Sequence, residues 1–258
     1  MILAPVFYIL VHFFTSILPQ NAIVANTTKP SNKQNKKYIY LSFDDGPLRG
    51  TGNCIDICLN EHTPATFFEV GMHQAKSAQT KKLYRRIFYN DSMFVIGNHS
   101  YTHANSEYLY FYHNPKMALN DFLRAKSKLS FRNNIVRLPG NNAWNTANVK
   151  YASNLVKPLV RKLDSAGFNI IGWDVEWKFN IYGRPLNSPQ FLIKKIDSAF
   201  IKHETRTKNH LVLLMHDYMF GSAADSIKLV KMIGMLKSNP NYELRKLSQY
   251  PGLINDGR

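Results

Sequence analysis

The chain has 258 residues, of which 45% are hydrophobic and 19% are charged, and these values exclude a largely disordered protein. Lys and Arg outnumber Asp and Glu by 33 to 17, and this excess favours anionic partners such as cell-envelope polymers or nucleic acid. Nucleic acid is the disfavoured partner, because no helix-turn-helix, zinc-finger or aromatic RNA-binding motif accompanies the charge. Most of the basic residues fall on stretches with helical periodicity, which is typical of solvated helix faces.

The first 37 residues differ in composition from the rest of the chain. Residues 2–18 are mostly apolar, and Ala25 offers a small residue for cleavage, so 1–25 is predicted to be an export signal although no Lys or Arg precedes the apolar run. An uncleaved membrane anchor is the alternative, because about 17 apolar residues lie at the lower limit for spanning a bilayer. The polar residues 26–37 predict a linker, and 38–258 the functional domain of a periplasmic or secreted protein.

From residue 38 onward, short β-prone runs alternate with amphipathic helical runs. Strands are predicted over 38–43, 65–70, 93–96, 135–138, 168–173, 210–215 and 242–247, and helices over 52–61, 74–89, 115–131, 149–166, 189–203 and 223–237. Asn114 is expected to cap the third helix, and Gly167 to end the fourth. This alternation predicts a parallel α/β sheet, closed by right-handed crossovers into a distorted (β/α) barrel of about seven strands.

The two cysteines, Cys54 and Cys58, fall four residues apart on the first predicted helix. One face of a helix brings their Cα atoms to about 6 Å, which is within the range of a disulfide bond, and export would permit that bond. Two small buried residues facing the core are the preferred interpretation. The pair alone lacks the ligands of a zinc site.

Polar side chains recur at the carboxyl ends of the predicted strands, where the active sites of parallel α/β barrels form. They are Asp44 and Asp45, His99 and His103, Arg137, Asp174 and Glu176, and His216 and Asp217. Their recurrence at one rim predicts a functional site there.

Asp44 and Asp45 are adjacent carboxylates before a Gly-Pro pair. Side chains alternate along a strand, so the two can serve one site only where the strand ends and the backbone turns. Neighbouring carboxylates repel each other unless a cation or a proton lies between them. A solvated turn is the alternative for this pair taken alone.

His99 and His103 are spaced so that they would lie one above the other on a helical turn, which suits two ligands of one metal ion. A surface or core pair is the alternative. With the Asp45 carboxylate, the two imidazoles make a three-ligand site with open positions, which a hydrolytic metal needs to hold a water and polarise a carbonyl.

Five segments in this order resemble the motifs of the NodB-type polysaccharide deacetylases, carbohydrate esterase family 4. They are 42–47 (SFDDGP), 99–103 (HSYTH), 137–139 (RLP), 173–177 (WDVEW) and 213–217 (LLMHD). The resemblance runs from about residue 38 to residue 217. The first two motifs are highly specific, and the third and fourth match in part.

The resemblance implies the NodB-homology fold and a metal-dependent hydrolase of carbon–nitrogen bonds other than peptide bonds. Such an enzyme removes N-acetyl groups from amino sugars of a cell-envelope or extracellular glycan. Asp44 resembles the general base and Arg137 the arginine that orients it. Asp45, His99 and His103 resemble the ligands of a divalent metal, with zinc preferred and cobalt or nickel as alternatives.

The resemblance also extends to the acid and to the acetyl pocket. His216 resembles the general acid that protonates the departing amine. Leu214 and Trp177 match residues that line the pocket for the acetyl methyl group, and ordinary core packing is the alternative for both.

Three positions depart from the family pattern. Gly140 stands where an aromatic residue usually follows the proline of the third motif, so the backbone N–H expected to stabilise the oxyanion is retained but the aromatic wall is not. Glu176 stands where the family usually has Asp, and either Glu176 or Asp174 is expected to tune His216, with Glu176 preferred. Trp173 stands where another acidic residue is common.

Two other functions are compatible with these motifs. An O-acetyl (xylan-type) esterase would use the same machinery, and a non-catalytic glycan-binding protein would keep the fold without turnover. The complete set of metal-binding and proton-transferring side chains argues against the binding protein.

Overall fold

The computed structural model of the protein describes residues 36–254 together with Met1. The predicted export signal and nearly all of the predicted linker therefore lie outside the described residues, as do 255–258. Within 36–254, no helix combines the length and the apolar character needed to cross a bilayer.

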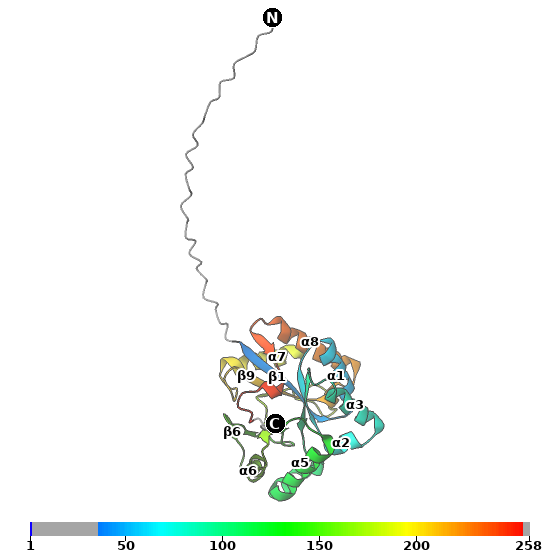
Figure 1. Ribbon diagram of the computed structural model, residues 1–258, viewed down its shortest axis with the longest axis vertical. Helices are drawn as coiled ribbons and strands as arrows, with labels where there is room; N and C mark the ends of the chain where they lie inside the picture. The colour runs from blue at the N-terminus through cyan, green and yellow to red at the C-terminus, as the bar shows by residue number, and fades with distance from the viewer. Residues whose placement is uncertain (2–35, 255–258) are drawn as a thin grey trace. The chain divides into compact units, whose positions relative to one another are not determined.

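One sheet forms the centre of this part of the chain (Figure 1). Its strands are paired in the order β6-β5-β7-β4-β3-β2-β1-β9-β8, and β10 pairs with the start of β1. Its described strands are β1 (Lys37–Gly46), β2 (Ala65–Glu69), β3 (Phe94–Asn98), β4 (Ile135–Val136), β5 (Trp144–Asn145), β6 (Lys150–Tyr151), β7 (Asn169–Ile170), β8 (Val175–Glu176), β9 (His210–His216) and β10 (Tyr242–Leu244). The pairs are parallel except those of β5 with β6 and β7.

The segment that holds β7 and β8 joins the two flanks of the sheet. β7 pairs with β4, and a few residues later β8 pairs with β9. The sheet thereby curls into an open half-barrel, which confirms the predicted α/β class, while the antiparallel pairs of β5 make the sheet mixed and not fully parallel as predicted.

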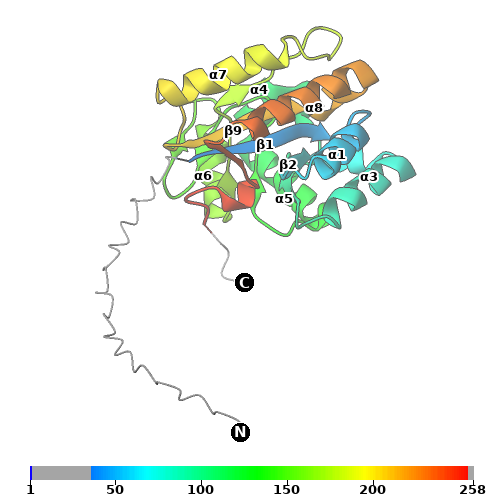
Figure 2. The same cartoon turned by 90° about the horizontal axis from the view of Figure 1, so that it is seen from above.

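Helices cover the outside of the curled sheet (Figure 2). They are α1 (Thr51–Asn60), α2 (Gly71–Ala75), α3 (Ala78–Phe88), α4 (Tyr108–His113), α5 (Pro115–Leu129), α6 (Lys157–Ser165), α7 (Pro189–Ile201) and α8 (Ala223–Ser238). Helix α8 packs against α1 and α7, and α5 packs against α6. Cys54 and Cys58 are buried on α1 as free thiols, in agreement with the preferred interpretation.

Two predicted helices are wrong in extent. The helix predicted over 74–89 is split, because Ser77 is extended and its side chain caps α3 by accepting from the Thr80 N–H. The helix predicted over 149–166 begins only at Lys157, since Pro158 is tolerated in a first turn but not in a helix interior. The residues before it form the unpredicted β5–β6 hairpin.

Of the two predicted helix-terminal residues, Gly167 is confirmed and Asn114 is not. Gly167 follows α6 with a φ of +79°, as expected of a residue that ends a helix. Asn114 precedes α5, but its side chain does not cap that helix and instead donates to the Tyr110 carbonyl at 2.8 Å. Helix α4, which holds Tyr110, was not predicted.

Side chains along β1 and β9 point alternately into the curled sheet and toward the covering helices, and this decides which of them lie at the rim. Tyr40 packs inside the barrel in one cluster with Phe68 and Val212, whereas Phe43 packs on the helix-covered face. Asp44 therefore continues the inward face of β1, and it lies beside His216, its register partner at the end of β9.

Candidate active site

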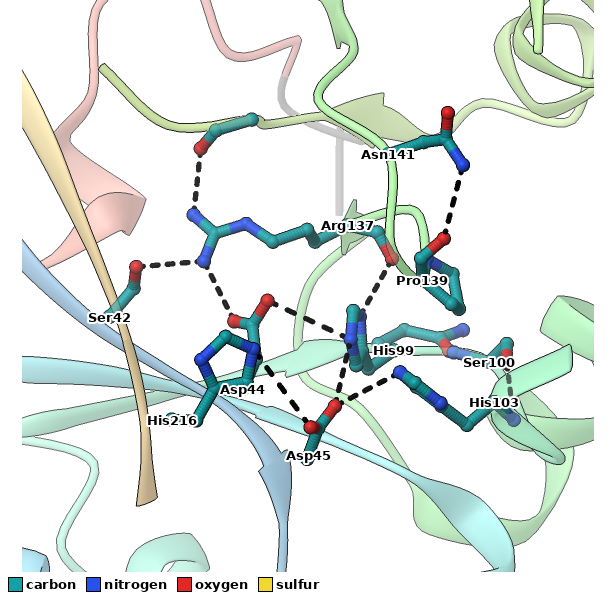
Figure 3. A network of polar contacts seen from close by, with 12 residues as sticks. Ser42, Asp44, Asp45, His99, Ser100, His103, Arg137, Pro139, Asn141 and His216 are labelled. Atoms are coloured by element: carbon teal, nitrogen blue, oxygen red, sulfur yellow. Dashed lines mark hydrogen bonds and ion pairs between the residues drawn. The ribbon is translucent and has the colours of Figure 1, made fainter. Parts of the chain in front are cut away.

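The structure brings Asp45, His99 and His103 together at the rim of the barrel (Figure 3). Their ligand atoms lie within 4.8 Å of one another, and Asp45 Oδ1 is 3.0 Å from His103 Nε2 and 3.4 Å from His99 Nε2. Ligand atoms of a tetrahedral zinc ion with bonds of about 2.0–2.1 Å would lie about 3.3 Å apart. The three side chains fit a metal of this kind.

The ionisation of this cluster agrees with a cation site. Burial alone would raise the pKa of Asp45, but the neighbouring His103 and His99 hold it well below its usual range. Asp45 Oδ1 is buried, and among the described residues it has no hydrogen bond of good geometry. Such a carboxylate oxygen is costly to bury unless a cation completes its surroundings.

Asp44 and Asp45 serve this site through a change of backbone conformation at the end of β1. Asp44 pairs regularly with β2 on one side and β9 on the other. Asp45 has a φ of +74°, and the register of the pairing between β1 and β2 shifts at this residue. His99 Nε2 consequently faces both carboxylates, at 3.7 Å from Asp44 Oδ2 and 3.4 Å from Asp45 Oδ1. Asp is one of the few residues that adopt positive φ readily.

The two histidines do not lie on a helical turn, so that part of the prediction is wrong. They flank an irregular loop in which Ser100 and His103 have φ values of +68° and +53°. The His103 N–H donates to Ser100 Oγ at 3.0 Å, and the two imidazole centroids lie 5.0 Å apart. The left-handed residues allow two rings from one loop to face one point.

Asp121 on α5 fixes the loop between His99 and His103, and no motif in the sequence selects it. Its Oδ2 accepts hydrogen bonds from the N–H groups of Tyr101 and Thr102, both at 3.0 Å, and from Thr102 Oγ1 at 3.1 Å. These charge-assisted bonds hold the backbone that places both imidazoles.

Main-chain carbonyls orient the histidines around Asp45. His99 Nδ1 lies 3.0 Å from the carbonyl oxygen of Arg137, and a carbonyl can only accept, so Nδ1 carries the proton and Nε2 keeps its lone pair for a metal. His73, which sequence reasoning missed, donates in the same way from Nδ1 to the Asp45 carbonyl at 2.7 Å.

The carboxylate of Asp44 is held by Arg137, whose side chain is fully buried. The guanidinium donates from Nη1 to Asp44 Oδ1 at 2.7 Å and to Ser42 Oγ at 2.8 Å. Its remaining donors reach the carbonyls of Ile171 at 3.1 Å and Gly172 at 2.7 Å. All three guanidinium nitrogens are therefore bonded, and Asp44 is fixed beside the candidate metal ligands.

His216 lies on the other side of the carboxylates, with Nε2 3.9 Å from Asp45 Oδ2 (Figure 3). Aromatic rings flank its imidazole, with centroids 5.0 Å away for Phe179 and 5.3 Å away for Tyr218. Its Nδ1 is buried and has no hydrogen-bond partner in the part of the chain that the structure describes.

Sequence comparison relates the chain to polysaccharide deacetylases. A family model described as polysaccharide deacetylase matches residues 31–140. YheN of Bacillus subtilis (strain 168), named as a polysaccharide deacetylase, is 25% identical over 196 residues, which are 72% of this chain and 60% of YheN. The peptidoglycan-N-acetylglucosamine deacetylase of Bacillus cereus (strain ATCC 14579) is 26% identical over 209 residues, 77% of this chain and 67% of the relative.

Solved structures share the fold. The catalytic domain of the peptidoglycan N-acetylglucosamine deacetylase from Eubacterium rectale ATCC 33656 has a TM-score of 0.61 at 22% identity, over 86% of this chain and 94% of that one. A Streptococcus mutans CE4 esterase also has a TM-score of 0.61, at 20% identity, over 82% of this chain and 87% of that one.

The matched family model and YheN are described as polysaccharide deacetylases and the Bacillus cereus relative as a peptidoglycan deacetylase, which supports the family predicted from the five motifs.

The carboxylates predicted to tune His216 do not contact it. Asp174 accepts from the N–H groups of Val212 at 2.7 Å and Arg206 at 2.8 Å. Glu176 lines a surface pocket on the α7 side together with Lys195. Neither carboxylate bonds to the imidazole within the described range, so the structure gives neither of them the tuning role.

The two residues predicted to line the acetyl pocket lie in different surroundings. Trp177 is fully buried under the helices, packs on Phe220 with centroids 5.7 Å apart, and donates from Nε1 to the Asn187 carbonyl. This is the core packing named as its alternative. Leu214 shares the inward face of β9 with His216, and the Gly140 N–H has no partner among the residues described.

Two further buried carboxylates, Glu69 and Asp217, converge on Gly46, next to the candidate metal ligand Asp45. A Cβ atom added at Gly46 would lie 2.5 Å from Glu69 Oε1 and 2.7 Å from Asp217 Oδ2. Asp217 Oδ2 accepts from Thr51 Oγ1, whereas neither oxygen of Glu69 has a hydrogen-bond partner within residues 36–254. Burial raises the pKa of Glu69 well above its usual range and that of Asp217 to about 7. The sequence signal for Glu69 was a charged residue inside an apolar strand.

Proposed function

We propose that the protein is a metal-dependent deacetylase that hydrolyses the N-acetyl groups of amino sugars in a cell-envelope or extracellular glycan. The supporting observation is the convergence of Asp45, His99 and His103 on one point, beside an Asp44 carboxylate that Arg137 holds in place. Asp45, His99 and His103 would hold the metal, for which zinc suits the mixed oxygen and nitrogen ligands. When bound, the metal would polarise the amide carbonyl and lower the pKa of the attacking water.

Asp44 would accept the proton of the attacking water. Its carboxylate is the one at the site that the predicted metal does not need, and its hydrogen bond from Arg137 fixes the oxygen that faces away from His99. A positioned base of this kind contributes about 10²- to 10⁴-fold to a rate.

His216 would protonate the amine nitrogen as it leaves. Its imidazole lies across the carboxylates from the two ligand imidazoles, with Nε2 3.9 Å from Asp45 Oδ2, so it would reach the substrate from the opposite side to the metal ligands. The Gly140 N–H, which lacks a partner among the described residues, is available to stabilise the oxyanion. The product would be acetate and a free amino sugar.

The proposed setting is outside the cytoplasm, with residues 1–25 acting as an export signal. The relatives named as peptidoglycan N-acetylglucosamine deacetylases support an N-acetylated glycan as the substrate class. The net charge of +16 suits an anionic cell envelope.

Release of acetate from a panel of N-acetylated glycans tests the proposal. The protein loaded with Zn²⁺ is expected to release acetate, and a chelator or the substitution Asp44→Asn is expected to abolish that release. Acetylated xylan in the same panel separates the amide from the ester reaction. Faster release from xylan would replace the proposal by the O-acetyl esterase, and no release from any glycan would overturn it.

A further inference from the structure

Tyr108, the first residue of α4, lies against the metal ligands although no motif selects it. Its ring centroid is 5.8 Å from that of His103, and the two rings are nearly perpendicular at 85°. Burial and then the charge of Asp45 raise the pKa of the Tyr108 phenol. The side chain is half-buried, and its hydroxyl has no hydrogen-bond partner over the described range, so it is free to bind a ligand.

Gly140 provides the surface on which the Tyr108 ring rests. A Cβ atom added at Gly140 would lie 3.1 Å from Tyr108 Cε1 and 3.3 Å from both Cδ1 and Cζ. Gly140 also has a φ of +62°, which side chains other than glycine adopt at a cost. A larger residue at position 140 would therefore compete with the Tyr108 ring for the same space.

Helix α4 is anchored to the loop that contains Gly140. The Tyr112 hydroxyl donates to the carbonyl of Pro139, and both Tyr112 and Phe111 are buried in the cluster that also includes Leu138. Tyr108 is thereby held at a fixed distance from the loop that supplies the Gly140 N–H. This support orients the ring before any substrate binds.

Tyr108 has an aromatic counterpart across the carboxylates. Burial and then the charge of Asp45 also raise the pKa of Tyr218, whose ring lies beside His216. Phe179 packs on both His216 and Tyr218 and remains 39% exposed. The reacting group would thus enter between Tyr108 on the side of His103 and aromatic rings on the side of His216.

We propose that Tyr108 forms a wall of the substrate site, stacking on the sugar ring that carries the acetamido group and donating a hydrogen bond from its hydroxyl, with Gly140 as the residue that leaves it room. This inference rests on the proposed deacetylase function. An aromatic ring offers an apolar face to the C–H groups of a sugar and, in tyrosine, a polar tip to its hydroxyl groups. The contact would determine the affinity for the substrate, whereas Asp44 and His216 would determine the rate of the chemical step.

Kinetics on the tetramer of N-acetylglucosamine test this wall. With Zn²⁺-loaded protein, Tyr108→Ala is expected to raise KM roughly 10-fold and Tyr108→Phe roughly 3-fold, while kcat stays within roughly 3-fold of the unsubstituted protein. Tyr110→Ala is the matched control, because Tyr110 lies on the same helix and is 59% exposed. Metal content is measured for each variant, and equal content would exclude an effect through His103.

Gly140→Ala extends the test to the proposed partnership. In the presence of Tyr108 this substitution should displace the ring and raise KM, and in the Tyr108→Ala background it should raise KM by a smaller factor. Equal factors in both backgrounds would show that Gly140 does not act through Tyr108 and would overturn that part of the inference.

Binding of the same tetramer to the Asp44→Asn variant separates this inference from the proposed function. If the unsubstituted protein releases acetate and Tyr108→Ala leaves KM unchanged, the inference is wrong and the function stands. If no acetate is released but Tyr108→Ala weakens binding to the Asp44→Asn variant roughly 10-fold, the wall stands and the protein is a glycan binder. If the tetramer neither binds nor reacts, both are overturned.

Discussion

Arg137 and Asp44 form a buried ion pair, in which Nη1 of the arginine lies 2.7 Å from Oδ1 of the carboxylate and the guanidinium is fully shielded from solvent. Removing one partner of such a pair leaves an uncompensated buried charge, whereas the intact pair fixes the geometry of the base. The same bond therefore bears on the stability of the fold and on the orientation of the proposed base.

Arg137→Ala is expected to lower kcat by about 100-fold, because the base loses its orientation. It is also expected to lower the free energy of unfolding by about 3–5 kcal/mol, measured by urea denaturation. If the variant does not fold, Arg137→Lys keeps the charge but lacks the planar fork, and it should fold with reduced kcat.

The matched control for Arg137 is Arg132→Ala. Arg132 pairs with Asp91 at the surface, where both side chains are more than half exposed, and such pairs contribute less than about 1 kcal/mol. Equal losses of stability in the two variants would contradict the assigned role of the buried pair.

Asp121→Ala is expected to weaken metal binding by about 10- to 100-fold, because the loop between His99 and His103 loses three hydrogen bonds to one carboxylate oxygen. Competition with a chromophoric chelator measures this affinity. Asp56→Ala removes an exposed carboxylate that pairs with Arg86, and it should leave the affinity unchanged. Unchanged affinity in Asp121→Ala would show that the loop holds its shape without this carboxylate.

Metal binding is expected to stabilise the protein. At a free metal concentration about 100 times Kd, a single site adds about 2.7 kcal/mol and raises the Tm of a domain of this size by about 5–10 °C. His99→Ala and Asp45→Asn should each remove most of this shift, measured by calorimetry with Zn²⁺ and with a chelator. A full shift in both variants would place the metal elsewhere.

Glu69→Gln is expected to stabilise the metal-free protein above neutral pH. A carboxyl group whose pKa is raised by folding binds its proton more tightly in the folded state, so the free energy of unfolding falls as pH rises toward the folded pKa. For Asp217 this interval runs from the ordinary 3.8 to about 7, and Glu69 adds a second contribution of the same sign. Gln has nearly the same shape and no such titration.

Between about pH 5 and pH 8, the Tm of the unsubstituted protein should therefore fall more steeply than the Tm of Glu69→Gln. Each kcal/mol of difference in the free energy of unfolding between the two proteins corresponds to about 2–4 °C in Tm. Glu61→Gln changes a carboxylate at the surface and serves as the control. If Tm depends on pH in the same way for Glu69→Gln and the unsubstituted protein, burial of Glu69 does not destabilise the folded state as its carboxyl group ionises.

The parts of the site predictable from the sequence are those that follow from strand ends. Asp44 lies near the end of β1 and His216 ends β9, and side chains alternate regularly along both strands up to these residues, so their position at one rim follows from the hydrophobic pattern. The loop from His99 to His103 was placed correctly but its conformation was not, because the left-handed φ values at Ser100 and His103 are not encoded by a local hydrophobic pattern.

Contacts between distant segments account for the residues that were missed. Asp121 reaches the ligand loop from α5, and His73 reaches the Asp45 carbonyl from α2, and both contacts depend on how helices pack on the sheet. Tyr108 lies on a helix of six residues, which is too short for a clear periodic signal. For Glu176 the motif was misleading: it suggested a contact with His216, but the described structure places Glu176 in a surface pocket.

The segment between β7 and β8 supplies the Ile171 and Gly172 carbonyls that hold the guanidinium of Arg137, and it also joins β4 to β9. Asp44 in turn needs β9 as its neighbour in the sheet. Asp44 and the candidate metal ligands Asp45, His99 and His103 lie in the amino-terminal half of the sequence, whereas Arg137 and the carbonyls that hold it come from the carboxyl-terminal half. Orientation of Asp44 therefore requires that both halves of the chain fold together.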